Sequence, residues 1–300
     1  MTAPGRGTRH APDRPRGRGR VVEPSDLVQL ARSRDVDVLQ PKTTKDESFY
    51  ETLRGLEPEV VLVASFGEIL RDPVLEAAPH GAINVHASLL PRHRGASPIQ
   101  AAIAQGDETT GVTIQRIVRA LDEGDILLAK ETPIGARETS GQLLQRLADL
   151  GAEAAVEALD QLADGTAVFT PQDHEQATYA RKIPKERGLI DWSRSSIEID
   201  RHVRAMSPWP GARSSHPAAR GKTRELVVLE VSPFHLENAA DLEAGGVLEA
   251  GSVVEAGRDF VVATSDGYLR LERLKPAGKP EMTGEAYLRG TRLEQGTLLG

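Results

Sequence analysis

The first half of the chain alternates between helical and strand-like patterns of hydrophobic residues. In four segments the apolar residues recur every three or four positions, which predicts amphipathic helices. Short apolar runs and one alternating run separate these segments and predict strands. The predicted helices are 24–35, 46–58, 97–106 and 139–165, and the predicted strands are 36–39, 59–66, 81–86 and 109–118. This alternation is typical of an α/β fold with an open, mostly parallel sheet.

Local signals mark the ends of several elements. Ser97 fits an N-cap and Gly106 a stop for the third helix. Thr139 and Gln142 have the spacing of a capping box at the start of the longest helix. The apolar face of that helix comprises Leu143, Leu144, Leu147, Leu150 and Leu159. The continuous apolar run at 59–66 suits a strand that is buried on both faces.

The pattern changes after the longest helix. Residues 166–210 are polar and irregular, and "SPWPG" (207–211) forms a stiff, proline-bracketed corner. From residue 225 onward, short apolar runs alternate with turns, and the Asp266–Gly267 pair between two runs is a hairpin signal. This end of the chain therefore predicts a small, mainly antiparallel β-barrel.

Composition narrows the classes of protein. The chain has 300 residues, of which 39% are hydrophobic and 27% charged, so it can bury a sizeable core. It has no cysteine, which excludes disulfides and thiolate metal sites, and no apolar run approaches the length of a membrane span. The net charge of −7 argues against a nucleic-acid coat protein, but the first twenty residues carry six arginines and only one acid.

Candidate chemistry is concentrated in the stretch "INVHASLLPRHRGASPIQ" (83–100). Asn84 and His86 lie two residues apart on a predicted strand, so their side chains share a face. The strand runs into a Pro/Gly loop, and open α/β sheets bind ligands at the carboxyl ends of their strands. The later stretch "LDEGDILL" supplies Asp122 and Asp125 in a loop that we expect at the same end. An amide and an imidazole that converge there can stabilise an oxyanion and move a proton, as acyl transfer to an amine requires.

Simpler structural roles are available for the same residues. Asn84 could cap a turn, His86 could be a structural histidine, and Asp122 and Asp125 flank Gly124 as turn residues often do. The sequence contains no HExxH, His-x₃-His, GxGxxG or Walker motif that would indicate a metal, dinucleotide or ATP site. The residues alone therefore indicate an α/β enzyme whose favoured chemistry is acyl transfer to an amine.

The stretch 83–100, followed by "GDETTGVTI" and "LDEGDILL", resembles the signature of the folate-dependent formyltransferase family. The N-x-H and SLLP-x-x-R-G parts, with an aspartate on a later loop, make this resemblance very specific. Residues 11–20, 179–212 and the tail from 259 are similar to the family members that formylate methionyl-tRNA. The resemblance covers the chain from about residue 11 to its last residue.

The resemblance implies a Rossmann-like formyltransferase sheet followed by an OB-like β-barrel. It implies transfer of a formyl group from 10-formyltetrahydrofolate to the α-amino group of methionyl initiator tRNA, in support of translation initiation. It further implies a cytoplasmic monomer that uses no metal. Asn84 and His86 would hold the formyl oxygen as it becomes an oxyanion, and Asp122 would orient His86 and help remove the proton from the attacking amine.

The resemblance also implies binding residues. The folate would be held by Ser88, Leu89, Leu90 and Pro91, by Phe66, Gly67, Ile69 and Leu70, and by Leu121 and Asp125. The tRNA would contact the C-terminal barrel and the basic loop, whose arginines are Arg14, Arg16, Arg18 and Arg20. Arg18 would make the most specific of these contacts, and the others would attract phosphates generally.

Two alternatives stay open. Formyltransferases that act on nucleotide-linked amino sugars share the Asn, His and Asp and carry a similar linker, although the Arg/Gly loop favours tRNA. A truncated, inactive tRNA-binding homologue is the other alternative, and the intact Asn84, His86 and Asp122 count against it.

We expect four parts along the chain: a mobile basic loop (1–20), a formyltransferase domain (21–178), a linker (179–212) and an OB-like, tRNA-contacting domain (213–300). Family members place a β-α-β unit of about 30 residues before the basic loop. The first eleven residues contain no apolar run that predicts a strand. The sequence therefore predicts a sheet that lacks its first strand and leaves the neighbouring strands unpaired. Either the native protein begins upstream of Met1, or the chain is genuinely shortened, poorly soluble and weakly active.

Overall fold

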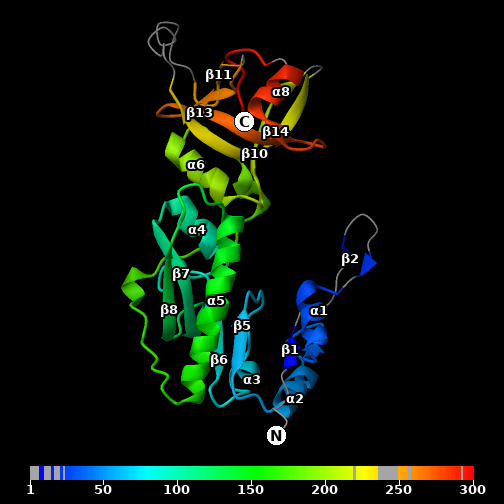
Figure 1. Ribbon diagram of the computed structural model, residues 1–300, viewed down its shortest axis with the longest axis vertical. Helices are drawn as coiled ribbons and strands as arrows, with labels where there is room; N and C mark the ends of the chain where they lie inside the picture. The colour runs from blue at the N-terminus through cyan, green and yellow to red at the C-terminus, as the bar shows by residue number, and fades with distance from the viewer. Residues whose placement is uncertain are drawn as a thin grey trace. The chain divides into compact units, whose positions relative to one another are not determined.

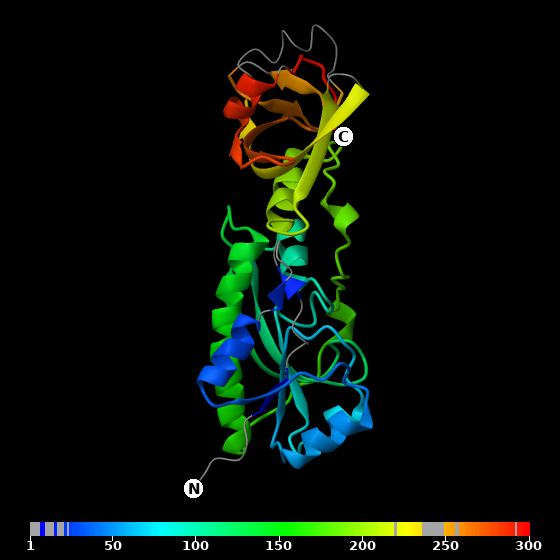
Figure 2. The ribbon, with the colours of Figure 1, turned by 90° about the vertical axis from the view of Figure 1, so that its right-hand side faces the viewer.

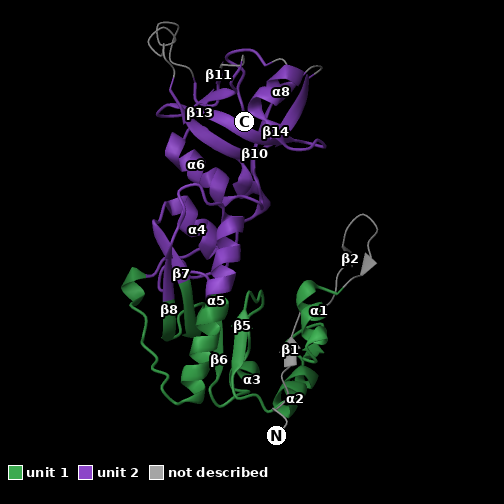
Figure 3. Ribbon diagram, in the orientation of Figure 1, with its two compact units in different colours: residues 1–86, 112–129, 151–176 green, residues 87–111, 130–150, 177–300 purple. Residues whose placement is uncertain are grey.

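The computed structural model describes residues 24–218, 221–235, 249–255, 258–291 and 293–300, and the backbone alone at 7–9, 15–16 and 21–22. The chain divides into two compact units (Figure 3). The first comprises residues 1–86, 112–129 and 151–176, and the second comprises residues 87–111, 130–150 and 177–300. Among the described helices, none is long and apolar enough to cross a membrane.

Helices and strands alternate along the first part of the chain (Figure 1). In order they are α1 (Asp26–Ser33), β4 (Asp37–Leu39), α2 (Glu47–Gly55), β5 (Val61–Ala64), α3 (Asp72–Leu75) and β6 (Ala82–His86). Next come α4 (Pro98–Gln105), β7 (Thr109–Arg116), β8 (Ile126–Pro133) and α5 (Ser140–Ala163). All eight elements that the sequence pattern predicts before residue 165 are confirmed. The described chain adds five that it does not predict: α3, β8 and the short strands at Gly7–Arg9, Pro15–Arg16 and Val21–Val22.

Two predicted caps differ in their outcome. At the start of α5, Thr139 and Gln142 exchange hydrogen bonds, from the Thr139 amide to Gln142 Oε1 (3.0 Å) and from the Gln142 amide to Thr139 Oγ1 (3.4 Å). Ser97 occupies the N-cap position of α4, as predicted, but its side chain makes no capping hydrogen bond. Pro98 follows it inside the first turn, where a missing N–H costs little and the fixed φ suits the helix. Gly106 ends α4 in the left-handed conformation, as predicted.

The described strands of the first part form three separate sheets, one of which is the pair β2 (Pro15–Arg16) and β3 (Val21–Val22). β1 (Gly7–Arg9) pairs in parallel with β4, and β5, β6, β7 and β8 form a four-stranded sheet in that order. The expectation that the first eleven residues hold no strand is therefore wrong, because backbone pairing with β4 makes Gly7–Arg9 a strand without an apolar run. Among the described strands, β5 pairs with β6 alone, which matches the expectation of a strand left unpaired on one edge.

This edge position changes the burial of β5. The strand alternates between half-buried and exposed residues, and Leu62 is 41% exposed. The prediction of burial on both faces is wrong for β5, because an edge strand has neighbours on one side only. In α5, Leu143 and Leu147 of the predicted apolar face are buried, as expected. Leu144 was predicted to belong to the same face, but it is 54% exposed and lies outside it.

The end of the chain forms an antiparallel, barrel-like sheet in the second unit. Its strands are β9 (Ala212–Ala218), β10 (Lys222–Phe234), β11 (Val253–Glu255), β12 (Val261–Ala263), β13 (Tyr268–Pro276) and β14 (Met282–Thr283). They pair in the order β11-β12-β13-β10-β9, with β14 on β13, and Figure 2 shows them curving around a common interior. The predicted Asp266–Gly267 hairpin joins β12 to β13. The helices α6 (Ser196–Ala205) and α8 (Gly284–Gly290) belong to the same unit.

A buried histidine sits in the interior of this unit. His216 is 2% exposed; one ring nitrogen, Nδ1, lies 2.7 Å from the Pro217 carbonyl oxygen, and the other, Nε2, lies 2.6 Å from the Tyr287 hydroxyl. Since a carbonyl can only accept, Nδ1 donates to Pro217. In the neutral ring, Nε2 then accepts from the Tyr287 hydroxyl. Burial lowers the pKa of His216 below its usual 6.5.

This pKa predicts that lowering the pH destabilises the second unit. The unfolded chain takes up a proton near pH 6.5 that the folded imidazole resists, so the free energy of unfolding falls as the pH drops below that value. Urea unfolding at pH 7.5 and pH 5.5 measures the loss, and His216→Gln should reduce it. His235→Gln, at an exposed position, is the control and should keep the full loss. An unchanged pH dependence in His216→Gln would contradict the assignment.

Candidate active site

Antiparallel pairing of β6 with β7 gathers polar side chains on one face of the sheet. Asn84 lies opposite Gln115, and His86 lies opposite Thr113. Residues directly opposite each other in an antiparallel pair point to the same face, so all four side chains share it. The intervening Val85 points to the other face, where a Cβ on Gly151 of α5 would lie 3.0 Å from its methyl group. The helix therefore covers one face and leaves the polar face to the loops.

Asp122 completes this polar cluster. Its Oδ2 lies 3.7 Å from His86 Nδ1, and its Oδ1 accepts a hydrogen bond of 2.9 Å from Gln115 Nε2. The side chains of His86 and Asp122 are only 6% and 13% exposed. Their separation is within the range of an ion pair and slightly beyond that of a direct hydrogen bond. The structure thus brings together Asn84, His86 and Asp122, as the sequence predicts.

The loop that carries Asp122 takes an unexpected route. Because β7 is antiparallel to β6, its last residue, Arg116, pairs with Ile83 near the beginning of β6. The expectation that the loop begins at the carboxyl end of β6 is therefore wrong, and the sheet is mixed at this point. Asp122 reaches His86 because the loop folds back over the polar face.

The loop can fold back only with an unusual backbone conformation at Asp122 and very close packing at Gly124. Asp122 has a φ of +54°, a left-handed conformation that costs on the order of 1 kcal/mol or more for a residue with a side chain. Gly124 is buried against β7, where a Cβ would lie 1.8 Å from the Arg116 carbonyl oxygen. The Arg116 amide donates to the Asp125 carbonyl at 2.9 Å and closes the loop.

Gln172 also belongs to this site, although no local pattern in the sequence indicates it. The residue lies fifty positions after Asp122. Paired hydrogen bonds of 2.8 Å between Ile126 and Thr170 align its segment with the start of β8. Gln172 Nε2 then donates to the carbonyl oxygens of Asp122 (2.9 Å) and Gly124 (2.7 Å).

The expected folate residues of the first unit lie in two loops. Ile69 and Leu121 are 79% and 63% exposed, so their apolar side chains are available to a ligand. Gly67 lies in open space, because a Cβ added there would meet no atom within 4 Å, and Phe66 is half-buried. Leu70 instead packs against the small core formed by Phe49, Tyr50 and Val74. Asp125 is half-buried beside the loop closure.

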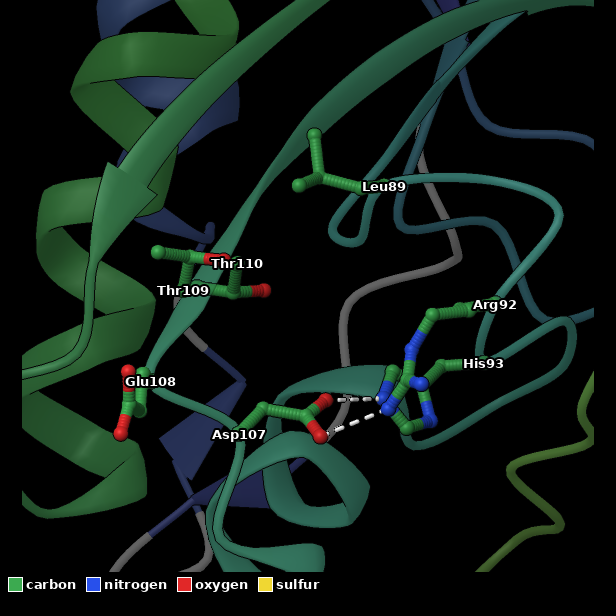
Figure 4. Close-up of a pocket in the computed structure, with 7 residues that line it drawn as sticks. All are labelled: Leu89, Arg92, His93, Asp107, Glu108, Thr109 and Thr110. Atoms are coloured by element: carbon green, nitrogen blue, oxygen red, sulfur yellow. Dashed lines mark hydrogen bonds and ion pairs between the residues drawn. The ribbon is translucent and has the colours of Figure 1, made fainter.

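The expected SLLP loop, Ser88–Pro91, belongs to the second unit. Ser88 Oγ donates to the Arg92 carbonyl at 2.7 Å, and the Leu90–Pro91 peptide is cis. Figure 4 shows Asp107 directed at Arg92 and His93, and it lies 2.6 Å from a nitrogen of each. These contacts border a cavity of about 280 Å³ that Leu89 also lines. The segment that follows the loop is thus tied to Asp107, two residues beyond α4, by an ion pair from Arg92 and a hydrogen bond with His93.

The structure describes only some of the basic residues that are expected to contact a nucleic acid. Arg14, Arg18 and Arg20 lie outside the described residues, and Arg16 is described by backbone alone, in the strand pair β2 (Pro15–Arg16) and β3 (Val21–Val22). In the second unit, α4, α6 and the segment 179–191 surround a cavity of about 700 Å³. Its lining includes the cations Arg181, Lys182, Arg187 and Arg194.

Comparison with known proteins decides the family. Residues 7–159 match the model of the formyl transferase family, and residues 182–292 match the model of its C-terminal domain. The chain belongs to the formyl transferase family. The expected fold, a formyltransferase sheet followed by a C-terminal barrel-like domain, is thereby confirmed.

Relatives of this formyl transferase match it over most of its length. It is 41% identical to the methionyl-tRNA formyltransferase of Nitratidesulfovibrio vulgaris, over 92% of this chain and 82% of that protein. It is 42% identical to that of Stutzerimonas stutzeri, over 96% of this chain and 88% of that protein. With the enzyme of Marinobacter nauticus it shares 50% identity, over 67% of this chain and 64% of that protein.

Solved structures share the fold at low sequence identity. HypX from Aquifex aeolicus, in complex with tetrahydrofolic acid, is 19% identical with a TM-score of 0.59 and covers 87% of this formyl transferase, with 44% of its own chain aligned. An N-formyltransferase from Helicobacter canadensis, in complex with folinic acid and dTDP-3-aminofucose, is 17% identical with a TM-score of 0.60. That match covers 82% of this chain and 81% of the other. Within the described residues of this formyl transferase, no group of three or more His, Asp or Glu could hold a metal ion.

The packing of Gly124 yields a stability prediction for this formyl transferase. Gly124→Ala should lower the free energy of unfolding by roughly 1–3 kcal/mol, because the added methyl group overlaps the Arg116 carbonyl. Gly67→Ala is the matched control in an open loop and should stay within about 0.5 kcal/mol of the wild type. Urea unfolding measures both variants. Equal stability of the two would show that the loop does not depend on the close approach to β7.

Proposed function

We propose that this formyl transferase moves a formyl group from 10-formyltetrahydrofolate to the α-amino group of methionine on initiator tRNA. The observation that carries the proposal is the set of methionyl-tRNA formyltransferases that share 36–50% identity with this chain. Several of them match it over more than nine-tenths of its length. We further propose that it acts as a cytoplasmic monomer.

In this proposal, the polar face of β6 and β7 is where the formyl group reacts. Because Nδ1 of His86 is the ring nitrogen beside Asp122, Nε2 is the nitrogen that would face the substrate. His86 Nε2 and the Asn84 amide would donate hydrogen bonds to the formyl oxygen as the amine attacks and the oxygen becomes negative. Donors that are fixed before the reaction stabilise this charge without reorganising, and such stabilisation is commonly the largest part of catalysis.

The proton and the leaving group also need partners. The amine forms a bond to the formyl carbon and loses a proton, the bond from that carbon to N10 of the folate breaks, and N10 gains a proton. Asp122 would keep His86 oriented and draw the proton from the amine, directly or through a water. Its low exposure supports this role, since a carboxylate that is shielded from solvent acts more strongly on a nearby charge.

The substrates would be recognised by apolar surface and by positive charge. The exposed side chains of Ile69 and Leu121 supply apolar surface of the kind that holds a flat heterocycle, with Asp125 and the Ser88–Pro91 loop supplying polar contacts. Arg14, Arg16, Arg18 and Arg20 in the basic loop 1–20, with the barrel over 213–300, would contact the tRNA. The domain over 21–178 would hold the chemistry and 179–212 would serve as the linker.

A formylation assay tests the proposal. The protein is incubated with 10-formyltetrahydrofolate and either methionyl initiator tRNA or dTDP-3-aminofucose, and the formylated product is measured over time. We expect formyl-methionyl-tRNA to accumulate and the sugar to remain unmodified. Formylation of the sugar alone would replace the proposed substrate, and tRNA binding without product in either reaction would refute an enzymatic role.

A further inference from the structure

Two buried glutamines hold Asp122 by both its side chain and its backbone. Gln115, on β7, donates to Asp122 Oδ1 at 2.9 Å, and Gln172 donates to the Asp122 carbonyl at 2.9 Å. The two side chains also meet each other, because Gln172 Nε2 lies 3.2 Å from Gln115 Oε1. The residues are 1% and 6% exposed, so water does not compete freely for these bonds.

The acceptors in this network fix the direction of both amides. The carbonyl oxygens of Asp122 and Gly124 can only accept, so the Gln172 NH₂ group must face them. That NH₂ group also faces Gln115 Oε1, which turns the Gln115 NH₂ group toward the Asp122 carboxylate. The chain of contacts therefore has one orientation, in which Oδ1 of Asp122 is anchored and Oδ2 is directed at His86.

Asp122 needs this support because its loop is not held by regular structure. The residue is in the left-handed conformation, and its carboxylate comes from the far end of β7 rather than from the strand that carries His86. A small displacement of the loop would change the 3.7 Å separation between Asp122 and His86. Strained backbone persists only where its surroundings determine it, and Gln172 binds the loop on both sides of Glu123.

We propose that Gln115 and Gln172 are positioning residues for formyl transfer, acting through Asp122. The inference rests on the proposed function of the site. Neither glutamine would touch the substrate. Their effect would be to keep the carboxylate at the distance and angle from which it orients His86, and displacement of a reacting group by about 1 Å can lower a rate roughly 100-fold.

The first test separates positioning from general stability. Gln172→Leu should lower kcat for formyl transfer about 10- to 100-fold and leave KM for the folate within about twofold. Ile114→Val is the matched control, because Ile114 is buried in the same strand as Gln115 but its side chain points to the opposite face. The control should lose stability and keep kcat. Equal kcat values in the two variants would overturn the proposal.

The second test asks whether the glutamines act through Asp122. If they do, adding Gln172→Leu or Gln115→Leu to Asp122→Asn should lower kcat little further, whereas independent effects would multiply. Multiplication of the effects would overturn the proposal while leaving the function of the site intact. If Asp122→Asn itself keeps the wild-type kcat, the role assigned to Asp122 fails, and the positioning role fails with it.

A measurement that does not depend on enzymatic activity tests the inference even if the protein does not formylate methionyl-tRNA. NMR signals of the His86 ring report its distance from a carboxylate. At a fixed pH of about 7.5, Gln172→Leu should shift these signals and Ile114→Val should leave them in place. An unmoved His86 signal in Gln172→Leu would show that Gln172 does not position the pair, whatever the substrate is.

Discussion

The candidate site depends on one constraint, the antiparallel pairing of β6 with β7. That register places Asn84 and His86 opposite Gln115 and Thr113 and so commits one face of the sheet to polar chemistry. It also sends the chain away from His86 at the end of β7, so the carboxylate can arrive only by a loop that folds back over the face. The left-handed Asp122, the missing side chain at Gly124 and the buried Gln172 are all consequences of that route.

Those features together give a site that is formed before a substrate arrives. Asp122 is anchored through one oxygen and directed through the other, and the ring it faces is almost fully buried. Preorganised groups of this kind stabilise developing charge without having to move, which is what formyl transfer to an amine requires. Ile69, in the loop after β5, and Leu121, in the loop after β7, have exposed apolar side chains that are open to a ligand.

The sequence predicted what depends on local pattern and missed what depends on long-range pairing. Periodicity located the helices and strands, and the two-residue spacing of Asn84 and His86 correctly placed them on one face. Periodicity cannot show the direction of a strand relative to its neighbour, so the antiparallel β7 was not foreseen. Gln172 was missed because its partners lie about fifty residues earlier, and β1 because backbone pairing rather than apolar character makes it a strand. The exposure of Leu62 likewise follows from the edge position of β5.

The claim that Asn84 and His86 stabilise the charge on the formyl oxygen can be tested by single-turnover kinetics. With saturating 10-formyltetrahydrofolate and methionyl-tRNA, the rate of the chemical step is compared between the wild type, Asn84→Ala and His86→Ala. Ile114→Val, on the opposite face of β7, is the control. The account predicts that each of the first two variants loses roughly 100- to 1,000-fold in rate, as removal of an oxyanion donor does, while the control stays close to the wild type. A chemical step that survives unchanged in His86→Ala would contradict it.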